Sequence, residues 1–206
     1  MKRTLIAAGI IACLAGFASV GFSDDDPAKP AMEAGSHDMG GMDAGGAAFE
    51  FEKASPEHIK MRRLVGEWES TMSMVTGPGE VAESKGSSKC TQFGEFWIIE
   101  DAEYEVMGMP FKGHGVYGYN AATKKYTSSW VDSTASWSMN SEGDMDKDGT
   151  LVFTATGPDY MNPGKMTTYT MKESWDGDDT RIMRSFVPGP DGKQVEMWKL
   201  TATRKK

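Results

Sequence analysis

Cysteine is scarce in this 206-residue chain, which contains only Cys13 and Cys90. Cys13 lies in an apolar N-terminal stretch that we expect to be removed, so Cys90 would have no partner for an internal disulfide. A lone cysteine on a predicted strand is more often a small buried apolar side chain than a reactive thiol. The folded part must therefore be stabilised by its core alone.

Histidine is also rare, with three residues in all, and the common catalytic motifs are missing. The chain has no Gly-x-Ser-x-Gly, no His-Glu-x-x-His, no phosphate-binding loop and no Cys-x-x-Cys. A catalytic arrangement would need His114 with Asp132 and a serine, or Glu100 as a general base, and no spacing supports either. We therefore expect that the protein does not catalyse a reaction. The alternative is an exported enzyme that uses His114 with Asp132, or Glu100.

Positive charge is in deficit, and the net charge is −8 at pH 7. An acidic protein repels nucleic acid and anionic membrane surfaces. We therefore expect neither nucleic acid nor a membrane surface as a partner. The sequence does not predict the oligomeric state.

Residues 1–23 have the features of a secretory signal peptide: a basic pair, an apolar run over residues 5–22 and then small residues. The run is short for a membrane span and is followed by three aspartates. We therefore expect export, to the periplasm or the medium, and no integral membrane span. Residues 10–13 resemble a lipoprotein box, so a lipid anchor at Cys13 is the alternative, although the apolar residues that follow favour ordinary cleavage.

Residues 24–54 are rich in Asp, Ala, Gly, Pro and Met and contain few branched apolar side chains. Such a segment cannot bury enough surface to offset the entropy of ordering, which predicts a disordered acidic Gly/Ala/Met linker. Within it, His37, Met39 and Met42 could bind a soft metal such as copper. A solvated linker of this composition is the favoured interpretation, so we predict no metal site.

The remaining residues, 55–206, predict an all-β domain. Ser55 and Pro56 begin a short helix that ends near residue 64, with His58 on its surface. Runs of alternating polarity then follow, bounded by Gly, Pro, Asn or Asp. They lie near residues 67–76, 83–93, 95–107, 111–119, 125–133, 135–142, 149–157, 165–175, 180–187 and 193–204. Because no helices remain to cover a sheet, we expect closure into an antiparallel up-and-down barrel of about ten strands, with a short N-terminal capping helix.

The start and the end of this domain carry a family resemblance. Gly66-Glu67-Trp68, at the opening of the first strand, resembles the Gly-x-Trp signature of lipocalins and the wider calycin barrels. In those folds a Trp plugs the closed end and a basic residue of the last strand packs across it. The resemblance implies these structural roles for Trp68 and Arg204.

A second resemblance covers nearly all of residues 55–206. It rests on Leu64–Trp68, Gly108–Gly113, Gly118–Asn120, Lys125–Tyr126, Ser129–Ser133 and Thr201–Lys205. These segments are similar to the bacterial domain-of-unknown-function family 1579, which implies no established activity. Haem binders related to nitrobindin use a His near the end of their calycin-like barrel. No His follows His114 here, so we expect no haem and no other cofactor.

Strand alternation predicts which side chains face the interior. The expected inward faces are Trp68, Ser70, Met72 and Met74; Phe96, Ile98, Glu100, Ala102, Tyr104 and Val106; Tyr126, Trp130 and Asp132; and Ile182, Arg184 and Phe186. The candidate ligand-binding residues are Glu100, Tyr104, His114, Trp130, Asp132 and Arg184. An apolar interior with a few polar groups would suit a small apolar or amphipathic molecule. A filled barrel with a structural or interaction role is a further alternative.

Overall fold

The computed structural model describes residues 52–77, 79–106, 108–160 and 162–206. The predicted signal peptide, the His37/Met39/Met42 tract and all but the last three residues of the predicted linker lie outside the described residues. Among those that are described, no helix is long and apolar enough to cross a bilayer.

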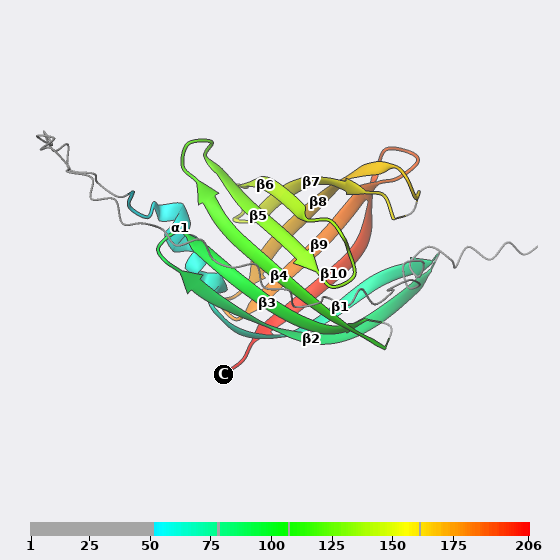
Figure 1. Ribbon diagram of the computed structural model, residues 1–206, viewed down its shortest axis with the longest axis horizontal. Helices are drawn as coiled ribbons and strands as arrows, with labels where there is room; N and C mark the ends of the chain where they lie inside the picture. The colour runs from blue at the N-terminus through cyan, green and yellow to red at the C-terminus, as the bar shows by residue number, and fades with distance from the viewer. Residues whose placement is uncertain (1–51, 78, 107, 161) are drawn as a thin grey trace, which may run out of the picture. The chain divides into compact units, whose positions relative to one another are not determined.

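Ten antiparallel strands form one closed barrel (Figure 1). They are β1 (Gly66–Gly77), β2 (Glu80–Phe93), β3 (Trp97–Val106), β4 (Met109–Asn120), β5 (Lys125–Asp132), β6 (Met139–Met145), β7 (Leu151–Pro158), β8 (Met166–Asp176), β9 (Thr180–Pro188) and β10 (Gln194–Arg204). Each strand pairs with its neighbour in sequence, and β1 pairs with β10 to close the ring. The predicted all-β fold class and up-and-down topology are confirmed.

A short helical segment precedes the barrel, consisting of α1 (Pro56–Met61) and the 3-10 turn η1 (Arg62–Leu64). The backbone N–H of Ser55 donates to His58 Nδ1 at 3.0 Å, which satisfies a donor at the helix start. The expectation that His58 is a surface residue is wrong. Its ring is buried and packs edge-on against Phe96 and Tyr119 at centroid distances of 5.1 and 5.6 Å. This contact holds α1 against the barrel.

The sixth strand begins later than the sequence predicts, at Met139 instead of near residue 135. Asp132 Oδ1 accepts hydrogen bonds from the backbone N–H and the hydroxyl of Thr134, at 2.8 and 2.7 Å. An Asp side chain that bonds the backbone two residues on forms a turn. This turn ends β5, and the extended-looking residues after it join the connection to β6.

Trp68 closes the end of the barrel at which α1 lies. The ring is fully buried, and its Nε1–H donates to the Leu64 carbonyl at 2.9 Å. The Arg204 guanidinium lies over the ring and donates to the carbonyls of Val65 and Arg63, at 2.6 and 2.7 Å. The glycine of the Gly-x-Trp segment is required here: Gly66 has φ +143°, and a Cβ would lie 2.4 Å from the Arg204 guanidinium.

Inside the barrel, large side chains pack against small ones. Trp130 on β5 lies directly opposite Gly115 on β4, and its ring also covers Gly113. A Cβ at Gly113 would approach the Trp130 ring to 2.1 Å, so the glycine makes room for the indole. The buried apolar residues that pack together in the core are Met61, Leu64, Trp68, Cys90, Ile98, Ala102, Tyr104, Tyr117, Tyr126, Leu151, Phe153, Ala155, Met171, Leu200 and Ala202.

Candidate functional site

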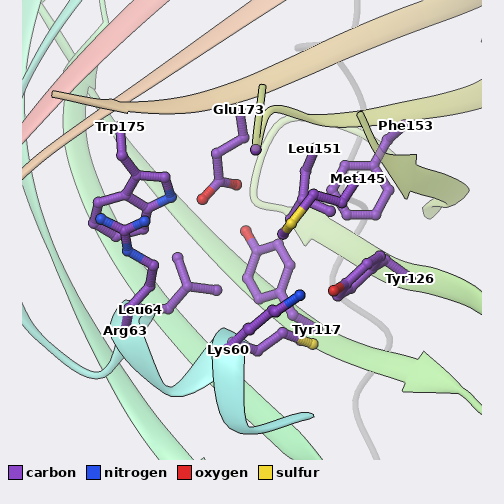
Figure 2. Close-up of a pocket in the computed structure, with 12 residues that line it drawn as sticks. Lys60, Arg63, Leu64, Tyr117, Tyr126, Met145, Leu151, Phe153, Glu173 and Trp175 are labelled. Carbon is purple, nitrogen blue, oxygen red and sulfur yellow. The ribbon is translucent and has the colours of Figure 1, made fainter. Parts of the chain in front are cut away.

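A cavity of about 350 Å³ lies between the helical segment and the inner faces of β4 to β8 (Figure 2). It is lined by Lys60, Met61, Arg63, Leu64, Tyr117, Tyr126, Met145, Gly149, Leu151, Phe153, Glu173 and Trp175. Its volume is at the lower end of the range for small-molecule sites. The helical segment forms one wall, so the cap of the barrel also builds the cavity.

Most of the lining is apolar or aromatic, and the polar groups are few. Figure 2 shows the Glu173 carboxylate and the Tyr117 hydroxyl near one another on one side of the cavity. The remaining charged groups, Lys60 and Arg63, come from the exposed side of the helical segment. A cavity with apolar walls and a few convergent polar groups is typical of a binding site.

Glu173 belongs to a buried ion cluster inside the barrel. The Arg181 guanidinium donates to Glu173 through Nε at 3.0 Å and through Nη2 at 3.3 Å. Its Nη1 donates to both oxygens of Glu100 at 3.2 Å. The Tyr117 hydroxyl donates to Glu100 Oε2 at 2.7 Å. The exposed fractions are 1 % for Arg181, 3 % for Glu173 and 4 % for Glu100. One buried guanidinium is therefore hydrogen-bonded to two buried carboxylates.

Burial, neighbouring charges and hydrogen bonds decide the protonation of Glu100 and Tyr117. Burial opposes ionisation of Glu100, but the charge of Arg181 and the hydrogen bonds from Tyr117 and Ser88 outweigh burial and hold the pKa of Glu100 below its ordinary value. Burial, followed by the negative charge of Glu100, raises the pKa of Tyr117 well above its ordinary value. Tyr117 therefore stays protonated and donates to an ionised Glu100.

A second contact shapes the side of the cavity at η1. The Arg63 guanidinium stacks on the Trp175 ring at 3.8 Å from its centroid. Arg63 also donates to the Gly177 carbonyl at 3.0 Å and lies 3.8 Å from the Asp178 carboxylate. Trp175 in turn packs edge-on against Trp68, with centroids 5.7 Å apart. The cavity wall is thus continuous with the closed end of the barrel.

Three of the predicted ligand-binding residues face the interior. Glu100 lies in the ion cluster, and Tyr104 is buried on the same strand, edge-on to Phe111. Burial, with a further contribution from the charge of Glu100, raises the pKa of Tyr104 to about 12. Trp130 packs half-buried against the core. None of these three lines the cavity.

The prediction that Arg184 faces the interior is wrong. Its side chain is 45 % exposed and lies 3.9 Å from Glu196 on the outer face. The inward residue is Arg181, three positions earlier and on the opposite face of β9. The apolar residues Ile182 and Phe186 led to the wrong assignment: they lie on the outer side, where the ammonium of Lys172 sits 5.4 Å from the Phe186 ring.

His114, a predicted ligand-binding residue, lies on the outer face and does not line the barrel interior. Its exposed ring pairs through Nδ1 with Asp101 at 2.7 Å. The direct neighbour of His114 on β5 is Val131, so Asp132, one residue on, points to the opposite face. Asp132 is occupied by its turn with Thr134. The structure therefore does not bring His114 and Asp132 together as a catalytic pair.

The sequence-based prediction named none of the residues that line the cavity as binding residues, and it also missed Arg181 of the ion cluster. Glu173 had a usable signal, because it alternates with Met171 on β8 and both are buried. Tyr117 alternates with Gly113 and Gly115 in the same way on β4. No local pattern distinguishes Arg181 from Arg184, since only the carboxylates of β3 and β8 identify the inward arginine.

Comparisons with known proteins agree with this architecture. The solved structures that resemble the chain include the S-type phycobiliprotein lyase CPES from Guillardia theta and Rv2717c from M. tuberculosis. The first has a TM-score of 0.50 and 18 % identity over 73 % of this chain and 93 % of its own. The second has a TM-score of 0.53 and 10 % identity over 75 % of this chain and 100 % of its own. At these identities they show a shared fold.

No curated protein matches the chain. The family model described as "Protein of unknown function (DUF1579)" matches residues 53–204, which is the whole barrel with its helical cap. The resemblance to this family that the sequence motifs indicated is thereby confirmed, and the chain belongs to the DUF1579 family, with a closed antiparallel barrel fold.

Proposed function

We propose that this protein binds a small apolar or amphipathic molecule, without chemical change, in the cavity between the helical segment and β4 to β8. The observation that carries the proposal is the cavity itself, about 350 Å³ with apolar walls and few polar groups. A closed barrel of this size can hold one small ligand. The proposed site thus lies at the capped end, away from Trp130 and Tyr104.

The structural neighbours support the fold more than the function. One of them is a phycobiliprotein lyase, so a protein with that described role has the same barrel fold. At 18 % identity nothing of its activity is carried over residue by residue. The proposal therefore rests on the lining of the cavity in this chain.

We propose, from the signal-like residues 1–23, that the protein meets its ligand after export. Mass spectrometry of the protein from its own host tests this. A mature N-terminus near residue 19 or 24 would support ordinary export. A lipid on Cys13 would show that the exported protein is anchored to a membrane. A chain that still begins at residue 1 would overturn the proposal of export.

A neutral apolar fluorophore, N-phenyl-1-naphthylamine, tests ligand binding directly. We expect a saturable rise in its fluorescence on titration with the protein. Met145→Trp places an indole at the cavity lining and should weaken binding by about ten-fold or more, equivalent to about 1.4 kcal/mol. Glu142→Trp is the matched control, because Glu142 lies on the outer face of the same strand. Unsaturable fluorescence, or equal affinity in both variants, would overturn the proposal.

A further inference from the structure

We infer that the polar group recognised in this cavity is an organic ammonium, with Glu173 as its counter-ion. This inference rests on the proposed function and specifies its ligand class as a small amine with an apolar body. Four features of the cavity and its surroundings carry it: the charge of the buried cluster, the hydrogen bonds of Glu173, the aromatic walls and the paired state of Arg63.

The buried cluster has one negative charge in excess. Arg181 supplies one positive charge to two carboxylates, Glu100 and Glu173, and all three side chains are at least nine-tenths buried. Among the described residues no second cation forms an ion pair with either carboxylate within 4.0 Å. Buried charges are retained when they are paired or coordinate a ligand, so the excess charge favours a cation in the adjoining space.

The two carboxylates differ in how many hydrogen bonds they accept. Glu100 accepts from Arg181 through both oxygens and from the Tyr117 hydroxyl, and it does not line the cavity. Glu173 accepts only from Arg181 among the described residues, one bond to each oxygen. A carboxylate has about four acceptor positions, so Glu173 retains capacity for two more donors. Glu173 is also the acidic residue that lines the cavity.

The aromatic walls of the cavity suit the apolar body of an organic amine. Four aromatic side chains line the cavity, namely Tyr117, Tyr126, Phe153 and Trp175. A cation is attracted to the faces of such rings, and an apolar body gains by leaving water. Figure 2 shows the Tyr126 ring beside the Tyr117 ring, with the Glu173 carboxylate above Tyr117 in this view. An ammonium could therefore be bound by the carboxylate while its carbon skeleton lies along the aromatic wall.

The two cations of the helical segment that line the cavity, Lys60 and Arg63, do not cancel this preference. Arg63 is occupied by Trp175, Asp178 and the Gly177 carbonyl. Lys60 is exposed and forms no ion pair with Glu173 within 4.0 Å. Its charge should oppose an incoming ammonium and attract an incoming carboxylate, which makes Lys60 a useful position for a test.

Calorimetric titration at pH 7 and low salt with three probes of similar shape tests the inference. The probes are 2-phenylethylamine, 2-phenylethanol and 3-phenylpropanoate, which carry a positive, a neutral and a negative head group. We expect the amine to bind about ten-fold more tightly than the alcohol, and the propanoate most weakly. Equal affinity of amine and alcohol, or tightest binding of the propanoate, would overturn the inference.

Two variants locate the counter-ion. Glu173→Gln should reduce amine affinity to that of the alcohol and leave alcohol affinity within about three-fold, with a thermal melt confirming that the variant is folded. Lys60→Met changes an exposed residue and should not affect folding. It should tighten the amine and weaken the propanoate, whereas Lys85→Met, on the exposed face of β2, should change neither. An amine preference that persists in Glu173→Gln, or that does not respond to Lys60→Met, would overturn the inference.

The two levels of proposal fail in different ways. If N-phenyl-1-naphthylamine and all three phenyl probes leave the protein unaffected, the proposed function fails and the inference with it. If the neutral fluorophore binds and Met145→Trp weakens it, but the amine is not preferred over the alcohol, the proposed function stands and only the ammonium assignment is overturned.

Discussion

The Arg204 guanidinium lies 4.2 Å from the centroid of the Trp68 ring, and the same two residues are direct cross-strand neighbours in the ladder of β1 and β10. The pair therefore seals one end of the barrel and joins its first strand to its last. The backbone continues the closure, because the N–H of Lys205 donates to the Glu67 carbonyl at 2.8 Å.

Replacing Trp68 by alanine should lower the free energy of unfolding by about 3–5 kcal/mol, because it leaves a large buried space next to Trp175. Urea unfolding followed by circular dichroism measures the loss. Trp97→Ala is the control, since Trp97 is 41 % exposed on the outer face. A loss in Trp68→Ala no larger than in the control would show that Trp68 does not close the barrel.

Arg181→Met should be far more destabilising than Arg184→Met. The first change leaves two buried carboxylates without their shared cation, which costs about 3–5 kcal/mol when a buried pair is broken. The second removes an exposed arginine and should change stability by less than about 0.5 kcal/mol. The urea midpoints of the two variants show which arginine faces the interior: Arg181, as in the structure, or Arg184, as the sequence suggested.

Stability should fall on acidification through Glu100. The folded-state pKa of Glu100 is lowered, so its contribution to stability is present above the unfolded value of about 4.3 and is lost as pH falls through the folded value. Urea unfolding between pH 7 and pH 3 should show this loss. Glu100→Gln should be less stable at pH 7 but lose less on acidification. A parallel pH dependence in both proteins would contradict the assigned ionisation.

Cys90 should be inert in the folded protein. Burial, the largest cause, and the negative charge of Glu100 raise its pKa to about 12. At pH 8 a thiol of that pKa is ionised in roughly one molecule in ten thousand, and the thiolate is the reactive form. In a Cys13→Ser background, Ellman's reagent should react slowly in buffer and rapidly in urea. Fast reaction in the native protein would show that Cys90 is accessible.

The inward faces show where reading the sequence succeeds and where it fails. On β3 the alternation holds without interruption, so Ile98, Glu100 and Tyr104 face the interior as predicted. On β9 the apolar residues Ile182 and Phe186 face outward, and an arginine takes the inward position. A rule that places apolar side chains inside cannot anticipate a buried cation whose partners lie on other strands.

The amino-acid sequence by itself determined the number of strands, their order, the helical cap and the family. These properties depend on local signals, namely the period of two in the strands, the turn residues between them and the Gly66-Glu67-Trp68 segment. Only the tertiary structure decided that Glu100 and Glu173 share Arg181 and that Glu173 lines a cavity beneath α1 and η1. These residues lie up to 81 positions apart, and their contact arises from closure of the barrel, which no local pattern encodes.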